Sequence, residues 1–484
     1  MSGLLNLRRV LVIMLGVGLF AMAARSITDP DVWWHLRTGE LIVATHSVPH
    51  SDPFSFTRFG QPWVAHEWLS DVLIYSLYRV AGWGGLIVPF GAITAAALLL
   101  TFLRCSGRPY VAAITTIWAA AASAPTWGVR PQMLSFLLAS LFLLILERAS
   151  ARPRLIWWTL PLILLWLNLH AEFALGIALM LLFFAGTAMD VALGFEPPGH
   201  AKPFLRHLGW AIVACFALVP LNPNGSRMYW YPVETLRSTA MQSYINEWFS
   251  PNFHQLRHLP FLLMVLGIVA ALPVSGRRLR PRELLLLLVV TAAGLHSTRH
   301  IAIFALVATP ILSSQLEGWL KRTGLSRRLT TQEPAPGRLR LALHAGVLLA
   351  LLGFTFVRVA VVLRQQAQLE GKRFPSAAVS FLTEQRPPGP LLNHYDWGGY
   401  LIWKLYPQYL VYVDGRADLY GDAFLYAHAS SFYLTDDWRK TLEHWHIQTV
   451  LLPPGAPLVN GLLAWGGWKQ IYGDGQAVIL TRSR

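Results

Sequence analysis

The sequence has 484 residues, of which 54% are hydrophobic and only 13% are charged. In soluble domains about a quarter of all residues are charged, so this composition excludes an ordinary soluble protein. The net charge of +15 would suggest a nucleic-acid ligand in a soluble chain. Here the arginines gather in short segments between apolar stretches, which is typical of membrane-protein loops and argues against nucleic acid as a partner.

The N-terminal 26 residues combine a basic start, an apolar core and the sequence AMA, which resembles a signal-peptide cleavage site. A cleaved signal peptide is one interpretation, and we favour an uncleaved first span. Apolar stretches long enough to cross a bilayer then recur along most of the chain. Eleven spans are predicted, over residues 10–27, 84–103, 110–127, 132–147, 155–169, 173–194, 208–221, 259–275, 283–296, 300–315 and 341–363.

The stretch 67–81 contains Glu67, Asp71 and Arg79, and we interpret it as an amphipathic helix at the membrane interface. With this helix not crossing, every second loop is basic, which places the N-terminus in the cytoplasm by the positive-inside rule. Residues 1–363 are therefore predicted to form a multi-pass transmembrane domain, with 28–83 as a long outer loop carrying interfacial helices. The basic segment 316–340 is predicted to be a cytoplasmic linker.

Residues 364–484 are predicted to form a separate extracytoplasmic α/β domain. The segments 390–395, 399–406, 409–415, 449–454 and 476–481 resemble strands, and helices are expected near 375–385, 422–433 and 437–446. Asp396, Asp414, Arg416 and Asp418 follow strand ends, where α/β domains place ligand contacts. We favour a structural interpretation, in which Arg416 pairs internally with an aspartate.

Polar side chains cluster directly after the first span, in the segment TDPDVWWHLRTGE. Asp29 and Asp31 are candidate catalytic residues, either as a base or as ligands of Mg²⁺ or Mn²⁺, because both ions prefer carboxylate oxygens. His35 is a further candidate catalytic residue, and Arg37 a candidate substrate-binding residue. The alternative is an ordinary polar loop with a tryptophan anchor at the membrane interface.

Later in the same loop, five side chains of metal-ligand type lie within 22 residues. Their spacing matches no zinc motif, so we interpret them as loop residues, with a turn or a helix start at Asp52. They are His46, His50, Asp52, His66 and Glu67.

Three short outer turns add candidate substrate-binding residues: His170 and Glu172 in NLHAEF, Arg299 and His300 in HSTRH, and Arg130 in GVRPQ. Ionisable groups at membrane depth are costly, and they usually line a cavity or a pathway. Arginine binds phosphate through a bidentate fork, so a lipid phosphate is the natural ligand here. Ordinary contact with anionic lipid headgroups is the alternative.

These features resemble the GT-C superfamily of membrane glycosyltransferases, which includes oligosaccharyltransferases, protein mannosyltransferases and aminoarabinose transferases. The segment TDPDVWWHLRTGE is similar to the acidic motif in the first outer loop of oligosaccharyltransferases, which implies a catalytic or metal-binding role for Asp29 or Asp31. The tail has DWGGY where oligosaccharyltransferases have a different motif, so acceptor-sequon recognition is not implied. The chain looks most similar to uncharacterised bacterial members carrying the segments DPDxWWHLRTG, NLH and DWGGYL.

The resemblance implies a transferase in the bacterial inner membrane that moves a sugar from a polyprenyl-phosphate donor to an envelope acceptor. The C-terminal domain would then be periplasmic. The acceptor is a glycan, a lipid or a protein, and membrane lipids are further partners. Two other classes stay open, a non-catalytic scaffold and a lipid or solute transporter. The sequence disfavours the transporter, because it shows no internal repeat and the inner span ends are poor in acidic residues.

Overall fold

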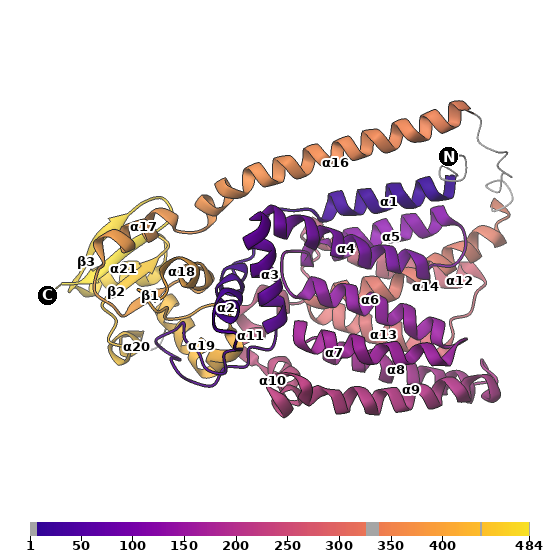
Figure 1. Ribbon diagram of the computed structural model, residues 1–484, viewed down its shortest axis with the longest axis horizontal. Coiled ribbons are helices and arrows are strands. Elements are labelled where there is room, and N and C mark those ends of the chain that lie inside the picture. Colours follow the sequence, from indigo (N-terminus) through magenta and orange to yellow (C-terminus); the bar gives the residue numbers. More distant parts are fainter. Residues whose placement is uncertain (1–6, 326–337, 436–437, 484) are drawn as a thin grey trace. The chain divides into compact units, whose positions relative to one another are not determined.

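The computed structural model describes residues 7–325, 338–435 and 438–483, and it is mostly helical with one small sheet (Figure 1). The chain divides into two compact units. We call the first the helical unit: Met1–Arg25, Ile87–Leu221 and Asn246–Val362. We call the second the mixed unit: Ser26–Leu86, Asn222–Ile245 and Leu363–Arg484.

The helical unit is built from apolar helices, two of which continue into the other unit. These are α1 (Leu7–Ala23), α4 (Gly84–Arg104), α5 (Pro109–Ser123), α6 (Gln132–Ala149), α7 (Thr159–Leu169), α8 (Phe173–Ala192), α9 (Pro198–Leu218), α12 (Leu259–Ser275), α13 (Pro281–His296), α14 (Ile301–Arg322) and α16 (Arg338–Arg373). Each of the eleven predicted spans therefore contains a helix.

By length and composition, seven helical stretches are able to cross a membrane: Gly84–Arg104, Gln132–Ala149, Phe173–Ala192, Pro198–Leu221, Leu256–Ser275, Thr298–Arg322 and Leu341–Arg373. Large apolar side chains such as Trp210, Leu349 and Phe356 are exposed on these helices, at 64%, 69% and 76%. An apolar outer surface of this kind suits a lipid environment, so the chain is a multi-pass membrane protein. The full count of eleven spans stays a prediction.

The predicted linker 316–340 is only partly described. Helix α14 continues through the first part of it, to Arg322, and α16 begins at Arg338. Residues 326–337 lie outside the described part of the chain.

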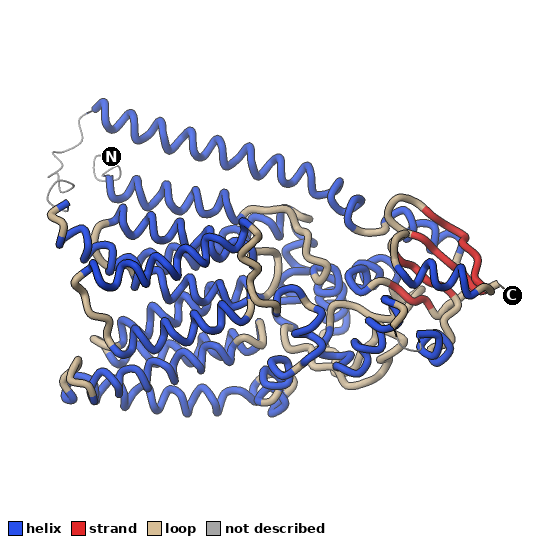
Figure 2. The backbone as a smooth tube through the Cα atoms, turned by 180° about the vertical axis from the view of Figure 1, so that it is seen from behind, coloured by secondary structure: helices blue, strands red, loops and turns tan. Residues whose placement is uncertain are grey.

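The mixed unit combines short helices with a four-stranded sheet (Figure 2). The strands β1 (Leu391–Asn393), β2 (Thr449–Leu452), β3 (Trp468–Gly473) and β4 (Val478–Arg482) have the order β1-β2-β4-β3. Strands β1 and β2 are parallel, whereas β4 is antiparallel to both of its neighbours. The helices are α2 (Val32–Thr45), α3 (Trp68–Ala81), α10 (Tyr231–Arg237), α11 (Thr239–Tyr244), α17 (Ser376–Gln385), α18 (Gly398–Leu405), α19 (Ala417–Tyr433), α20 (Trp438–His444) and α21 (Pro457–Trp465).

Residues 28–83 were predicted to belong to the transmembrane domain, whereas residues 26–86 group with the C-terminal residues in the structure. The reason is packing. The ring of Trp33 in α2 lies 5.4 Å from that of Phe374 and 4.9 Å from that of Tyr400, both edge-on. The backbone N–H of Phe56 donates to the carbonyl of Val411, 3.1 Å away. The early loop thus supplies core residues to the C-terminal sheet domain.

Two strand predictions in the tail were wrong. Residues 399–406 form most of helix α18, which buries Tyr400, Leu401 and Leu405 at helical spacing. In the segment 409–415, only Val411 forms isolated bridges, to Ser55 and Leu391. A continuous apolar run does not distinguish a buried helix from a buried strand, and that ambiguity explains the error. Strand β3 was missed, because its exposed Lys469 and Gln470 hide the strand pattern.

Candidate functional site

The predicted aspartates lie in the turn that leads into α2 of the mixed unit. The backbone N–H of Asp31 donates to Oδ1 of Asp29 over 3.0 Å, and both side chains are half-buried. A β-carbon added to Gly415 would lie 1.8 Å from Oδ1 of Asp31, so only glycine allows this close approach. Asp31 is therefore held against the loop between α18 and α19.

His35 lies one turn into α2 and is almost fully buried, at 2% exposure. Its Nδ1 is 2.6 Å from Oδ1 of Asp71, and its Nε2 is 3.9 Å from Oε1 of Glu67. Oε1 of Glu67 is also 3.6 Å from Nε2 of His66. Glu67 precedes α3 and Asp71 occupies its first turn, so the two acids lie four residues apart on one helix face.

Burial and the neighbouring carboxylates make the carboxyl groups of this site weak acids. Burial raises the pKa of Glu67 to about 8; His35 opposes the rise, and Asp71, Asp418 and Asp31 add to it. Burial also raises the pKa of Asp71 well above its ordinary value. The pKa of Asp418 is raised by burial as well, against a hydrogen bond from Tyr231. We call Asp31, His35, Glu67, Asp71 and Asp418 the acidic cluster. It is able to hold a proton at neutral pH.

The sequence analysis named every member of the acidic cluster but did not bring them together. Glu67 was interpreted as a loop residue, Asp71 as part of an interfacial helix face, and Asp418 as structural. The signal that was available is the i, i+4 spacing of Glu67 and Asp71, which places both on one side of any helix. Their approach to His35 depends on tertiary packing of α2 on α3.

The structural interpretation of Arg416 is confirmed. Its guanidinium is buried and pairs with Asp414 and with Asp52, each at 2.7 Å. The Tyr420 hydroxyl donates to Asp414 over 2.7 Å. Asp52 also accepts hydrogen bonds from the backbone N–H groups of Phe54 and Ser55, which confirms the turn expected there.

Arg37 joins two helices within the mixed unit. Its guanidinium pairs with Glu40 at 2.6 Å and donates to the carbonyl oxygens of Ile402, Trp403 and Tyr406 at the end of α18. These contacts give Arg37 a structural role, and the structure does not bring it into the acidic cluster.

A second polar group, which we call the arginine cluster, lies in the helical unit. The Nε of Arg299 donates to Oε1 of Glu172 over 3.0 Å, and its guanidinium lies 5.5 Å from the ring of Trp248. Oε2 of Glu172 is 3.5 Å from Nδ1 of the buried His170. Arg130 pairs with Glu247. The structure thus brings together Arg130, His170, Glu172 and Arg299, which come from three separate predicted turns, and their substrate-binding role stays a prediction.

The arginine cluster keeps its acids ionised. Burial tends to raise the pKa of Glu172, but His170 and Arg299 lower it well below its ordinary range. In the same way Arg130 and Arg299 outweigh burial and lower the pKa of Glu247. In the part of the chain that the structure describes, the Nη groups of Arg299 have no partner. Nδ1 of His300 is buried and forms no hydrogen bond with the described residues. The Nη groups of Arg299 are available to an anion.

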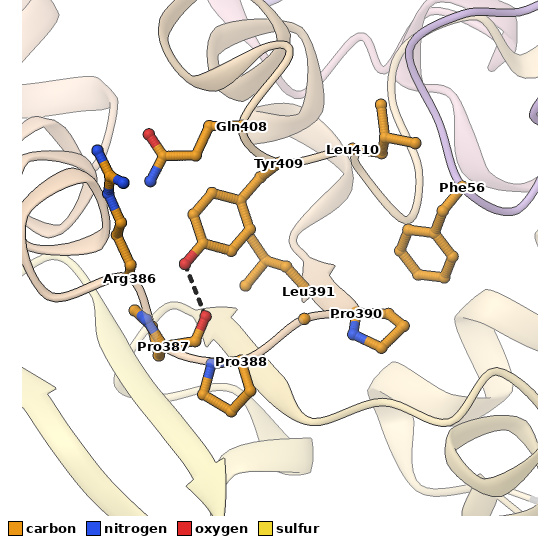
Figure 3. A pocket seen from close by; sticks show the side chains of 10 residues that line it. Phe56, Arg386, Pro387, Pro388, Pro390, Leu391, Gln408, Tyr409 and Leu410 are labelled. Atoms are coloured by element: carbon orange, nitrogen blue, oxygen red, sulfur yellow. Dashed lines mark hydrogen bonds between the residues drawn. The ribbon is translucent and has the colours of Figure 1, made fainter.

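A cavity of about 430 Å³ opens elsewhere in the mixed unit (Figure 3). Pro387, Pro388 and Pro390 form much of its wall, and the Tyr409 hydroxyl donates to the carbonyl of Pro387 over 2.7 Å. Arg386 supplies its charged group. None of the predicted site residues lines this cavity.

No family model and no curated protein matches the chain. Solved structures do match, and they confirm the expected resemblance at the level of the fold: the chain shares its fold with an archaeal oligosaccharyltransferase and with ArnT.

Three structures are particularly similar. The oligosaccharyltransferase of Archaeoglobus fulgidus, tethered to an acceptor peptide, has a TM-score of 0.58 and 12% identity, covering 93% of this chain and 70% of that one. The same organism's AglB, in complex with an inhibitory peptide and a dolichol-phosphate, has a TM-score of 0.56, 12% identity and coverages of 92% and 69%. ArnT from Cupriavidus metallidurans, bound to undecaprenyl phosphate, has a TM-score of 0.50, 12% identity and coverages of 97% and 97%.

Proposed function

We propose that the protein is a glycosyltransferase that moves a sugar from a polyprenyl-phosphate donor to an envelope acceptor. The observation that carries the proposal is the acidic cluster, in which Glu67 and Asp71 lie beside the buried His35, and Asp31 and Asp418 act electrostatically on Glu67. Burying several acids together is costly, and perturbed carboxyl groups of this kind concentrate at catalytic sites. The fold shared with structures that hold dolichol-phosphate or undecaprenyl phosphate supports the same reaction class.

In this proposal the acidic cluster provides acid–base chemistry. A carboxyl group with a pKa near 8 is able to accept a proton from an acceptor hydroxyl and to release it later. His35 holds Asp71 through a 2.6 Å contact and fixes the orientation of that carboxylate. Asp31 and Asp29 act at the entrance to α2, either as the base or as ligands.

The donor set fits a divalent cation. Asp29 and Asp31 offer hard carboxylate oxygens, and His66 and Glu67 form an adjacent His–Glu pair. These residues would hold Mg²⁺ or Mn²⁺, and a bound ion would neutralise negative charge on a phosphate leaving group.

The arginine cluster is proposed to bind the donor phosphate. The unpartnered Nη groups of Arg299 offer two parallel donors, the geometry that phosphate oxygens prefer. Arg130, His170, Glu172 and His300 would position Arg299 and add charge. The reaction then takes place on the non-cytoplasmic face of the bacterial inner membrane, with eleven spans, a cytoplasmic N-terminus and a periplasmic C-terminal domain.

Native mass spectrometry of the gently purified protein tests the proposal. We expect a polyprenyl-phosphate species to co-purify with the wild type and with Asp29→Asn/Asp31→Asn, but not with Arg299→Ala. Arg278→Ala is the matched control, because this exposed arginine also lies at a helix connection and has no partner among the described residues. If only bulk phospholipid appears in every sample, the transferase proposal loses its ligand.

A further inference from the structure

Two arginines of the helical unit lie together at the C-terminal end of α1. The Nε of Arg25 donates to the carbonyl of Met22 over 2.9 Å, and the Nε of Arg358 donates to the carbonyl of the preceding residue, Ala21. Arg25 also donates through Nη1 to the carbonyl of Ala124, and its guanidinium lies 5.0 Å from the ring of Trp127. Arg358 comes from α16, so the pair brings together segments far apart in the chain.

The positive charge of this pair is not balanced by the protein. Within the described residues, neither guanidinium forms an ion pair with a carboxylate. The C-terminal end of a helix carries only about half a negative elementary charge, which leaves most of the pair's two positive charges uncompensated.

Several donors of the pair also lack a partner. Both Nη groups of Arg358 and Nη2 of Arg25 form no hydrogen bond within the described part of the chain. Both side chains are half-buried, so these groups remain accessible. The hydrogen bonds to the α1 carbonyl oxygens use only the Nε–H of Arg25 and of Arg358. Both Nη groups of Arg358 are left without a hydrogen bond to the described residues.

The position of Arg358 along α16 indicates what kind of ligand reaches it. The apolar part of α16 starts at Leu341. At 1.5 Å per residue, Arg358 lies about 26 Å further along the helix. The hydrocarbon core of a bilayer is about 30 Å thick, which places the guanidinium near the boundary where lipid phosphates lie. The neighbouring Trp127 is of the side-chain type that is enriched at this boundary.

We propose that Arg25 and Arg358 form a binding site for the phosphate of an anionic glycerophospholipid, separate from the arginine cluster around Arg299. Two uncompensated guanidinium groups favour an anionic headgroup, such as that of phosphatidic acid or phosphatidylglycerol, over a zwitterionic one. A bound lipid would fasten the end of α1 to α16 and stabilise the helical unit. The site does not depend on the proposed transferase reaction.

Delipidated protein in a neutral detergent tests the proposal by native mass spectrometry and by thermal unfolding. The probes are dioleoyl phosphatidic acid, dioleoyl phosphatidylglycerol, undecaprenyl phosphate, dioleoyl phosphatidylcholine and inorganic phosphate. We expect the anionic glycerophospholipids to bind the wild type and to raise its unfolding temperature. Phosphatidylcholine should bind at least tenfold more weakly. Arg358→Gln and Arg25→Gln should each lose most of this difference.

Arg364→Gln is the matched control, because this arginine is exposed on the same helix and has no partner among the described residues. It should keep the binding of the wild type. Arg299→Gln should also keep it, which separates this site from the proposed donor site. Response to inorganic phosphate alone would assign the site to a free anion, and a response only to undecaprenyl phosphate would assign it to the donor; both overturn the proposal. Equal binding by wild type and Arg358→Gln overturns it as well.

Discussion

The raised pKa of Glu67 makes a quantitative prediction about stability and pH. In the folded protein this pKa is about 8, against an ordinary value of 4.5. Folding therefore favours the protonated carboxyl. The stability that Glu67 contributes is fully present below pH 4.5 and is lost as the pH rises towards 8. One pKa unit corresponds to about 1.4 kcal/mol, so the loss across this window reaches about 5 kcal/mol at most.

Replacement of Glu67 by glutamine removes the ionisable group and keeps the shape of the side chain. We expect Glu67→Gln to become more stable than the wild type at pH 8 and to differ little from it at pH 4.5. The assay is thermal or denaturant unfolding of both proteins at closely spaced pH values. Glu443→Gln is the control, because Glu443 is exposed and should leave the pH dependence unchanged. If Glu67→Gln and the wild type lose stability in parallel between pH 5 and pH 8, the carboxyl is not buried as the structure has it.

Three further predictions concern other groups. Arg416→Met leaves Asp52 and Asp414 buried without their cation, and it should lower the free energy of unfolding by about 3–5 kcal/mol. Arg439→Met, at an exposed arginine, is the control. A decrease below about 1 kcal/mol for Arg416→Met would contradict the buried ion-pair network. Asp422→Ala removes the carboxylate that binds Ser238 and Thr239 at the start of α11, and it should cost about 1 kcal/mol. Chelation of divalent ions should lower sugar transfer and be reversed by Mg²⁺ or Mn²⁺; unchanged transfer in excess chelator would refute the metal role.

The sequence predicted the helices of the membrane part well, because an apolar run long enough to cross a bilayer is a strong signal. It placed the turns of His170, Glu172 and Arg299 on one predicted side of the membrane, but it did not predict their contacts. It did not predict the acidic cluster. The approach of Asp71 to His35 is a tertiary contact between α2 and α3, and periodicity within one helix carries no information about it.

The sheet domain was harder to predict for a different reason. The segment 399–406 is a short, mostly apolar run in which Lys404 is the one charged residue, so its pattern fits both a buried helix and a buried strand. The partner of Arg416 shows the same limit. The sequence predicted that Arg416 pairs with a nearby aspartate, and Asp414 is two positions away. The sequence did not predict the second partner, Asp52, which is 364 positions away.

The interleaving of residues 26–86 with the C-terminal residues has a consequence for biosynthesis. Trp33 and Phe54 emerge from the ribosome early, but their contacts Tyr400 and Tyr406 are made some 350 residues later. At about 5–20 residues per second this delay lasts tens of seconds, during which the early segment has no completed core. The early segment therefore depends on protection by the membrane surface or by a chaperone until synthesis is complete. A chain truncated after residue 362 should be degraded rather than accumulate.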